Sequence, residues 1–318
     1  MLVREDRGFS RLLWSAIVPA SRTAGADHVM GDNRLNIGLG QGNVLCGMKY
    51  DDRLALIGEG LPIVLESARG FWNASRQLQS SDREATVLHD HAVEEAGKIL
   101  ILLDIARCPK KIVARRIGPM MRWFYDHLAR TIYARAASWS AMNVAQLRGY
   151  VANERQAHYL DGEYGEYIMP NSELFRREST LYADIEVYED GRPHWNRPGR
   201  LPTLFPNFTP TALSLAEAFS ALGLLSVPGV QAIARAWDAL EFSDAQTAQD
   251  SDALIRATIA AVIDGGLASD AAEQHHVNTV YGHWQMPMYN FDFDLVRVPR
   301  DALESERERL FNAERGGW

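Results

Sequence analysis

The chain has 318 residues, of which 47% are hydrophobic, so it is long enough to bury one large core or two modest ones. The net charge of -8 argues against nonspecific coating of nucleic acid by the whole surface. The two cysteines lie far apart, which disfavours a disulfide framework or a zinc site, and no apolar run reaches the roughly 18–20 residues that cross a bilayer. These features are typical of a cytoplasmic globular protein without membrane contact.

The first part of the chain changes in texture near residue 50. Residues 1–47 mix glycine with polar and scattered apolar residues and have no regular period, so we expect a flexible N-terminal tail there, with Met48 as an alternative natural start. An apolar series from Asp51 to Trp72 then predicts a long amphipathic helix. Pro62 is an obstacle inside it, and two helices in line are the alternative.

The next patterns are also helical. Ser81–Glu84 resembles a capping box, and the Ala-, Leu- and Ile-rich run 85–107 that follows predicts a second helix. The run 110–137 is interrupted at Gly118-Pro119, which predicts a new helix from Pro119 with Arg122 in its first turn. A further helix is expected from Ala141 to about Leu160.

The remainder of the chain divides into two parts. Residues 161–209 are rich in glycine, proline and aromatic residues, and Thr180–Tyr188 alternates like a strand before a turn at Glu189–Arg192. Helical periodicity resumes from Thr209 to about Asp264, and Asp301–Ala313 predicts a last helix. The sequence therefore predicts a mainly α protein whose antiparallel helical bundle precedes a small β-containing insertion and a C-terminal helical extension.

Arg122 and His127, within the sequence RWFYDH, are the candidate catalytic residues. An imidazole can move a proton near neutral pH, and a guanidinium can neutralise the charge that builds up on a phosphorane, so the pair could cleave RNA without metal. On one straight helix the two side chains would diverge by about 140°. This divergence motivates a site shared by two copies of the chain in a homodimer, or a distorted first turn.

A basic stripe surrounds this pair, in which only one acid, Asp126, occurs. Its eight members are Arg107, Lys110, Lys111, Arg115, Arg116, Arg122, Arg130 and Arg135. Aromatic residues are interleaved with them, so the stripe suits a phosphate backbone and stacked bases, and we expect RNA binding by Lys110, Lys111, Arg115, Arg116 and Arg130. The alternative is a solvated helix face whose aromatic residues belong to the core.

The preceding predicted helix carries polar residues at helical spacing. His91, Glu94 or Glu95, and Lys98 fall on one face of it, and we expect them, with Asp126, to support the candidate pair by orienting His127 or Arg122. Gly97 would allow another helix to approach closely. Surface Glu-Lys pairs and a satisfied histidine are the alternative.

Three sequence matches together resemble one known family. They are AVEEAGK (Ala92–Lys98), FYDH (Phe124–His127), and LYAD followed by GRPHWNRP (Leu181–Pro198). The combination resembles the AbiV-type abortive-infection proteins, which belong to the HEPN superfamily of helical bundles. Many HEPN proteins are metal-independent ribonucleases with an Arg-x4-6-His motif, which falls here on Arg122 and His127. Trp123 departs from the polar residue that many of them carry after the motif arginine.

The resemblance implies a fold, a function and partners. We expect a HEPN-like bundle over residues 48–165, a β-containing insertion over 166–209 and a helical extension over 210–318. The implied function is a toxin-type endoribonuclease in phage defence that needs no metal or organic cofactor. The implied partners are RNA, a second copy of the chain, and an antitoxin-like or phage-encoded regulator.

Two other functions compete with this one. His89-Asp90, with His91 and Glu95 nearby, suggests an HD-type metal phosphohydrolase, although that scheme usually needs a further upstream histidine, and only His28 in the tail is available. A non-catalytic helical module that binds RNA or protein is the other alternative. The ten carboxylates between Glu154 and Asp190 are typical of a solvated surface, but they could also cover the basic stripe.

Overall fold

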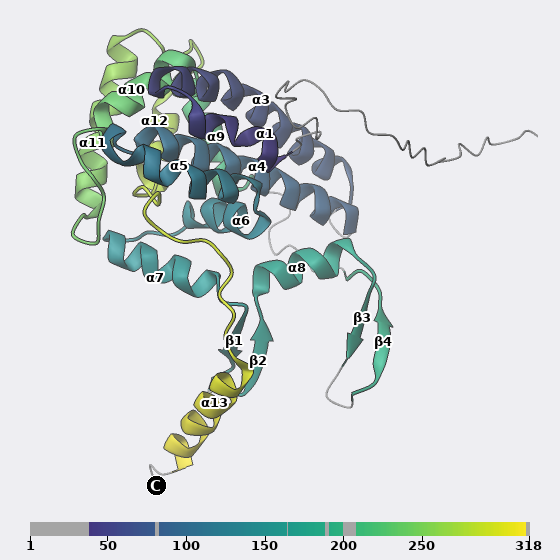
Figure 1. Ribbon diagram of the computed structural model, residues 1–318. Coiled ribbons are helices and arrows are strands. Elements are labelled where there is room, and N and C mark those ends of the chain that lie inside the picture. Colours follow the sequence, from purple (N-terminus) through teal and green to yellow (C-terminus); the bar gives the residue numbers. More distant parts are fainter. Residues whose placement is uncertain (1–37, 80–82, 164, 188–190, 200–207, 316–318) are drawn as a thin grey trace, which may run out of the picture. The chain divides into compact units, whose positions relative to one another are not determined.

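The computed structural model describes residues 38–79, 83–163, 165–187, 191–199 and 208–315. Residues 37–318 form one compact unit. The described part is mainly helical with two small antiparallel hairpins, which confirms the predicted mainly α class (Figure 1). None of its helices is long and apolar enough to cross a membrane.

The first helices follow one another with short connections. They are α1 (Leu39–Gly42), α2 (Val44–Gly47), α3 (Tyr50–Gln77), α4 (Arg83–Arg107), α5 (Lys110–Tyr125), α6 (His127–Ala136) and α7 (Val144–Glu154). The middle of the chain contains β1 (His158–Asp161), β2 (Tyr167–Pro170), α8 (Ser172–Leu181), β3 (Asp184–Val187) and β4 (Pro193–Asn196). The last helices are α9 (Thr211–Ala221), α10 (Val227–Trp237), α11 (Ala248–Asp264), α12 (Gln274–His283) and α13 (Arg300–Arg315).

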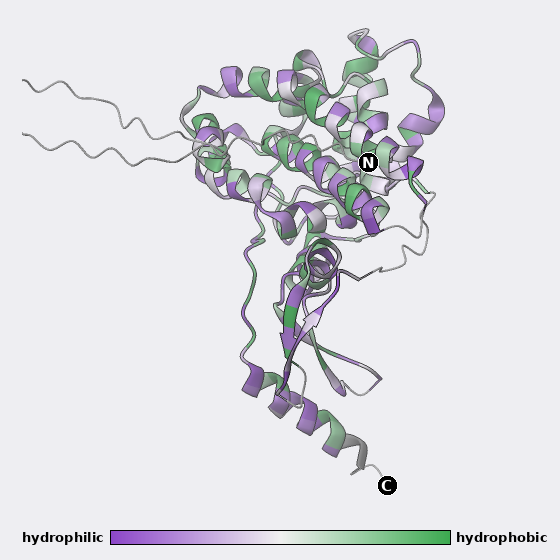
Figure 2. Cartoon of the chain, turned by 90° about the vertical axis from the view of Figure 1, so that its right-hand side faces the viewer, coloured by the Kyte–Doolittle hydropathy of each residue, from purple (hydrophilic) through white to green (hydrophobic). Residues whose placement is uncertain are grey.

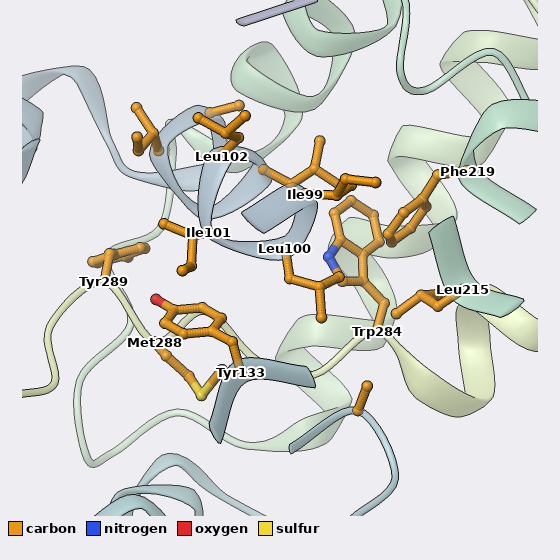
Figure 3. Packing of buried hydrophobic residues seen from close by; sticks show 14 of the residues in the cluster. Ile99, Leu100, Ile101, Leu102, Tyr133, Leu215, Phe219, Trp284, Met288 and Tyr289 are labelled. Atoms are coloured by element: carbon orange, nitrogen blue, oxygen red, sulfur yellow. The ribbon is translucent and has the colours of Figure 1, made fainter. Parts of the chain in front are cut away.

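Helix α4 is the central element of the core. Every residue from Ile99 to Arg107 is buried, because this half of the helix is apolar on nearly all sides and packs against α3, α6, α9 and α10. Figure 3 shows Leu100 beside Trp284, which lies against Phe219, their ring centroids 4.8 Å apart. The other helices are amphipathic, and polar and apolar residues alternate along them in Figure 2.

Helix α3 confirms the predicted long amphipathic helix and corrects its alternative. The predicted apolar positions Leu54, Ile57, Leu61 and Leu65 are buried, and the helix continues through Pro62 without a break. The division into two helices is therefore wrong. Pro62 lies on the exposed side, where the backbone can adjust to the missing N–H donor by a slight bend.

The predicted start of a new helix at Pro119 is wrong, and this changes where Arg122 lies relative to His127. Pro119 lies inside α5 rather than at a helix start, so Arg122 occupies the last turn of α5 and not the first turn of a new helix. The break falls at Asp126, whose extended backbone and side chain cap α6, with the amide of Ala129 donating to Oδ1 at 2.8 Å. Trp123 fixes the end of α5 because it is buried against Phe293.

A buried polar network joins α4 to α6 and to the segment before α13. Asp104 is fully buried and accepts hydrogen bonds from Arg107, from the hydroxyl of Tyr133 at 3.2 Å and from the amide of Met288 at 2.7 Å. The guanidinium of Arg107 lies 4.7 Å from the ring centroid of Trp237 and 4.8 Å from that of Trp284. The role of Arg107 is therefore structural, which removes it from the predicted basic surface.

The segment before α3 is partly ordered, contrary to the expected flexible tail over residues 1–47. Residues 39–47 form the short helices α1 and α2, and Leu45 is buried. Arg53 holds this segment by donating from Nε to the carbonyl of Leu45 at 2.8 Å and from Nη2 to that of Met48 at 2.9 Å. Residues 1–37 lie outside the described part of the chain.

The two hairpins occupy the region expected to contain β structure. Strands β1 and β2 pair antiparallel with Leu160 opposite Ile168, so this hairpin begins before the expected boundary at residue 166, and the helix expected to Leu160 ends at Glu154. Strands β3 and β4 pair with Ile185 opposite Trp195. The strand expected from Thr180 therefore begins only at Asp184, after α8.

Candidate functional site

Helix α8 is bound to the bundle mainly through ion pairs. Arg176 Nη1 contacts Asp90 Oδ1 at 2.8 Å, and Arg177 Nε contacts Glu94 Oε1 at 3.2 Å, both carboxylates belonging to α4. Glu173 accepts from Arg135 of α6 at 2.9 Å. Thr180 is fully buried, and it adds a non-ionic contact to this interface. These contacts place α8 against α4 and beside the last turn of α6, which carries Arg135.

His127 is the first residue of α6, and Glu94 fixes its ring. His127 Nδ1 lies 2.7 Å from Glu94 Oε2, and Arg177 Nη2 lies 3.3 Å from His127 Nε2. A guanidinium can only donate, so Nε2 accepts and Nδ1 carries the proton that is donated to Glu94. The contacts therefore assign the tautomer with the proton on Nδ1, and the Nε2 lone pair is directed at Arg177.

Glu94 is the centre of this cluster. Its side chain is 6% exposed, whereas that of His127 is 45% exposed. Besides His127, it contacts Arg177 and Nη1 of Arg130, the latter at 3.3 Å. A buried carboxylate without hydrogen-bond partners would be costly, and here the two guanidinium groups and the imidazole supply them.

Gly97 makes the close approach of α4 and α6 possible. A β-carbon built on Gly97 would lie 2.3 Å from the carbonyl oxygen of Arg130, which is too close for any side chain. This confirms the expectation that Gly97 admits a neighbouring helix. Because Glu94 lies one turn before Gly97 on α4, the same approach brings its carboxylate within reach of His127.

Arg122 does not join His127 in this cluster. It is exposed, and its charge lowers the pKa of Asp292, although burial opposes this effect and hydrogen bonds to Asp292 contribute more to the shift. No hydrogen bond connects Arg122 with His127 within the described residues. The two residues lie on different helices, so the 140° argument for a shared site between two copies does not apply, and the homodimer stays a prediction.

The basic stripe does not form one exposed surface. Arg107 and Arg130 are buried, the latter with Nε donating to the carbonyl of Phe124 at 2.7 Å. Lys110 lies over the ring of Tyr50, and Lys111 pairs with Glu241. Arg115 is exposed and Arg116 half-buried. The interleaved residues Trp123 and Tyr133 are core residues, as the alternative interpretation of the stripe expects.

The remaining predicted supporting residues have separate surroundings. His91 stacks on Phe71 with ring centroids 5.3 Å apart, and Glu95 pairs with Lys98, whose ammonium group lies 5.5 Å from the centroid of the Phe124 ring. His91, Glu94 and Arg177 also line one small pocket with a volume of about 10 Å³, room for about one water molecule. Of the predicted polar face, only Glu94 contacts His127.

The groups proposed for a metal site are engaged elsewhere. Within the described part of the chain, no three His, Cys, Asp or Glu side chains converge in a way that would hold a metal ion. Asp90 instead contacts His89 at 3.3 Å and Arg176. Burial alone would raise the pKa of Asp90, but the hydrogen bond from His89 and the charge of Arg176 lower it below its ordinary value.

Sequence reasoning missed Arg176 and Arg177. They lie inside the acidic stretch that was expected to act only through its carboxylates, and the stretch 172–181 was not predicted as a helix. A signal was available, because Asn171 is a favourable cap and the residues after it form an amphipathic turn pattern. Glu173 does pair with Arg135 of the basic stripe, but the contact with the His127 cluster is made by Arg177.

Comparisons with protein-family models, with curated proteins and with solved structures gave no match. The resemblance to the AbiV-type family and the HEPN-like character of the bundle therefore stay predictions. The contacts of His127 with Glu94 and Arg177 are the features of the structure that bear on function.

Proposed function

We propose that this protein is a metal-independent endoribonuclease in which His127 is the acid or base. The observation that carries the proposal is the 2.7 Å hydrogen bond from His127 Nδ1 to the buried Glu94. Such a carboxylate fixes the tautomer and orientation of a catalytic imidazole and stabilises the imidazolium that forms when the ring accepts a proton. The proposed role in phage defence, as an abortive-infection toxin, rests on the sequence resemblance alone.

The proposed reaction uses the ribose 2′-hydroxyl as nucleophile. When RNA binds, the 2′-hydroxyl displaces Arg177 Nη2 from the lone pair of His127 Nε2. Nε2 then accepts the 2′-hydroxyl proton while the 2′-oxygen forms a bond to the adjacent phosphorus. The bond from phosphorus to the 5′-oxygen of the next nucleotide breaks, and this oxygen takes a proton from the imidazolium or from water. The products are a 2′,3′-cyclic phosphate and a free 5′-hydroxyl, so no oxidant or metal is needed.

Glu94 is a positioning residue in this scheme. Because its carboxylate is buried and bound by two arginines and by His127, it acts on the substrate only through His127. Arg122 was the predicted electrostatic stabiliser, but within the described residues no hydrogen bond or ion pair connects it with the His127 cluster. The chemistry still requires a cation near the phosphorane.

A non-catalytic binding module is the second candidate function. The same cluster favours it, because Glu94 binds His127, Arg130 and Arg177 and could simply hold α4, α6 and α8 together. The two candidates differ in what the half-exposed His127 does. In a binding module, replacing His127 changes at most the affinity for RNA.

The experiment that separates them uses two end-labelled oligoribonucleotides of one sequence, with ordinary and with 2′-O-methyl ribose. We expect cleavage of the first to a 2′,3′-cyclic phosphate and no cleavage of the second, with similar binding of both by fluorescence anisotropy. Binding without cleavage of either oligonucleotide would favour the module. Cleavage of both, with dependence on added Mn²⁺ or Mg²⁺, would favour a metal phosphohydrolase.

A further inference from the structure

We propose that Arg177 of α8 is the catalytic guanidinium that stabilises the phosphorane next to His127. This inference rests on the proposed ribonuclease function and identifies the cation that the reaction needs near the phosphorane. The β-containing insertion predicted from the sequence, which includes α8, would then contribute a residue to the site. The site would then consist of Glu94 from α4, His127 from α6 and Arg177 from α8.

The position of the Arg177 guanidinium is the first argument. Its three nitrogens have different partners, because Nε donates to Glu94 at 3.2 Å, Nη1 donates to Glu178 at 2.9 Å and Nη2 lies 3.3 Å from His127 Nε2. Each Nη carries two N–H groups, so Nη2 has a second donor besides the one directed at His127. A phosphate oxygen that accepts from it at about 2.9 Å lies within about 6 Å of Nε2, close enough for one phosphodiester to contact both groups.

The fixed orientation of Arg177 is the second argument. Glu94 binds both His127 and Arg177, so one buried carboxylate sets the acid-base group and the cation relative to each other. Burial would lower the pKa of Arg177, but the attraction and hydrogen bond of Glu94 raise it above its ordinary value. The bond from Nε to Glu94 can remain while Nη2 exchanges its contact with His127 for a phosphate oxygen, so the cation needs little reorganisation when charge develops on the phosphorane.

The other arginines of the region are less suited to this role. Arg130 is buried, and its Nε is bound to a backbone carbonyl. Arg176 donates to Asp90 and Glu173. Arg122 has no hydrogen bond with His127 in the described structure.

The test compares single-turnover cleavage of one oligoribonucleotide by matched arginine variants of the full chain. Arg177→Gln should lower the rate about 100- to 1000-fold, the usual cost of removing one preorganised donor from such a site, and Arg177→Lys should recover part of the loss. Arg122→Gln should stay within about threefold of the parent. Arg176→Gln is the control for α8, because it loosens the same helix without touching His127.

A second measurement covers the case in which Arg177 variants fold poorly. Adding millimolar methylguanidinium to Arg177→Ala should restore part of the rate but leave His127→Ala inactive, because a small guanidinium can occupy the vacated position. An Arg177→Gln rate within threefold of the parent, with His127→Ala inactive, would overturn the role of Arg177 and leave the ribonuclease proposal intact. If the parent chain cleaves no faster than His127→Ala, the ribonuclease proposal itself fails.

Discussion

Gly97 of α4 faces the backbone carbonyl of Arg130 in α6 so closely that a β-carbon on Gly97 would lie 2.3 Å from the oxygen. This contact sets the separation of the two helices that carry Glu94 and His127. We predict that Gly97→Ala destabilises the fold by about 1–3 kcal/mol, the usual cost of overpacking a core. Urea denaturation measures this change.

Gly70 of α3 is the matched control for Gly97. A β-carbon there meets nothing within 4 Å, so Gly70→Ala should stabilise the protein by up to about 1 kcal/mol through helix propensity alone. Equal effects of the two substitutions would mean that α4 and α6 do not approach each other as described.

Glu94→Gln should destabilise the protein, because the substitution leaves the guanidinium groups of Arg130 and Arg177 without their common carboxylate. Removing one partner of a buried ion pair costs about 3–5 kcal/mol, and we expect a value toward the lower end because His127 and Arg177 are partly exposed. The midpoint of urea unfolding reports the loss.

Glu95→Gln is the control for that variant. Glu95 is adjacent in sequence and forms its ion pair with Lys98 on its own helix, so its removal should cost no more than about 1 kcal/mol. If Glu95→Gln is as destabilising as Glu94→Gln, the contacts of Glu94 with His127, Arg130 and Arg177 do not stabilise the fold more than a pair within one helix.

Asp90 predicts a pH dependence of stability. Its folded-state pKa is lower than its ordinary value, so its ion pair with Arg176 stabilises the folded state above the unfolded pKa of about 3.9. This contribution is lost as the pH falls through the folded-state pKa. Asp90→Asn should therefore melt at a lower temperature than the parent at pH 7, and the gap should close in acid. A gap that persists unchanged below pH 3 would exclude this origin.

The environment of Glu154 predicts a pH dependence of stability opposite in sign to that of Asp90. Burial, with repulsion from Glu173, raises its pKa, although Arg135 opposes the shift. A raised folded-state pKa gives stability below the unfolded value of about 4.3, and this stability is lost as the pH rises through the folded-state value. Glu154→Gln should therefore raise the melting temperature at pH 7 and have no such effect at pH 3.5. A lower melting temperature at pH 7 would contradict the assignment.

The contacts of the segment before α3 predict that removing it lowers stability, which a flexible tail over residues 1–47 would not. A chain that begins at Met48 loses the buried Leu45 and the carbonyl that accepts from Arg53 Nε, so it should melt at a lower temperature than a chain that begins at Ile37. Differential scanning calorimetry of the two chains gives the comparison. Identical melting temperatures would show that α1 and α2 add nothing to stability.

The sequence predicted the elements that depend on local patterns. The apolar series of α3, the run of α4 and the small residue Gly97 each predicted a feature that the structure confirms, because periodicity and side-chain size act over a few residues. The helix break was predicted at Gly118-Pro119, before Arg122, but it lies at Asp126, between Arg122 and His127. Pro119 is tolerated inside α5, and the buried Trp123 and the cap at Asp126 set the end of the helix. These are tertiary effects that no local pattern contains.

The site was only half predictable for the same reason. His127 and Glu94 were candidates because their residue types suit acid-base chemistry. Arg177 lies 50 positions after His127 and reaches it only because α8 is held to α4 by Asp90 and Glu94. Contacts between segments so far apart in sequence depend on the whole fold.

The central claim is that His127 performs acid-base catalysis on RNA without metal. The most direct test is the rate at which the pure full-length chain cleaves an oligoribonucleotide in excess EDTA, compared with His127→Ala and with the surface control His275→Ala, whose imidazole is 65% exposed on α12. We predict that His275→Ala cleaves like the parent and that His127→Ala loses about 100-fold or more, the usual contribution of a positioned acid or base. Equal rates for the parent and His127→Ala would contradict the account.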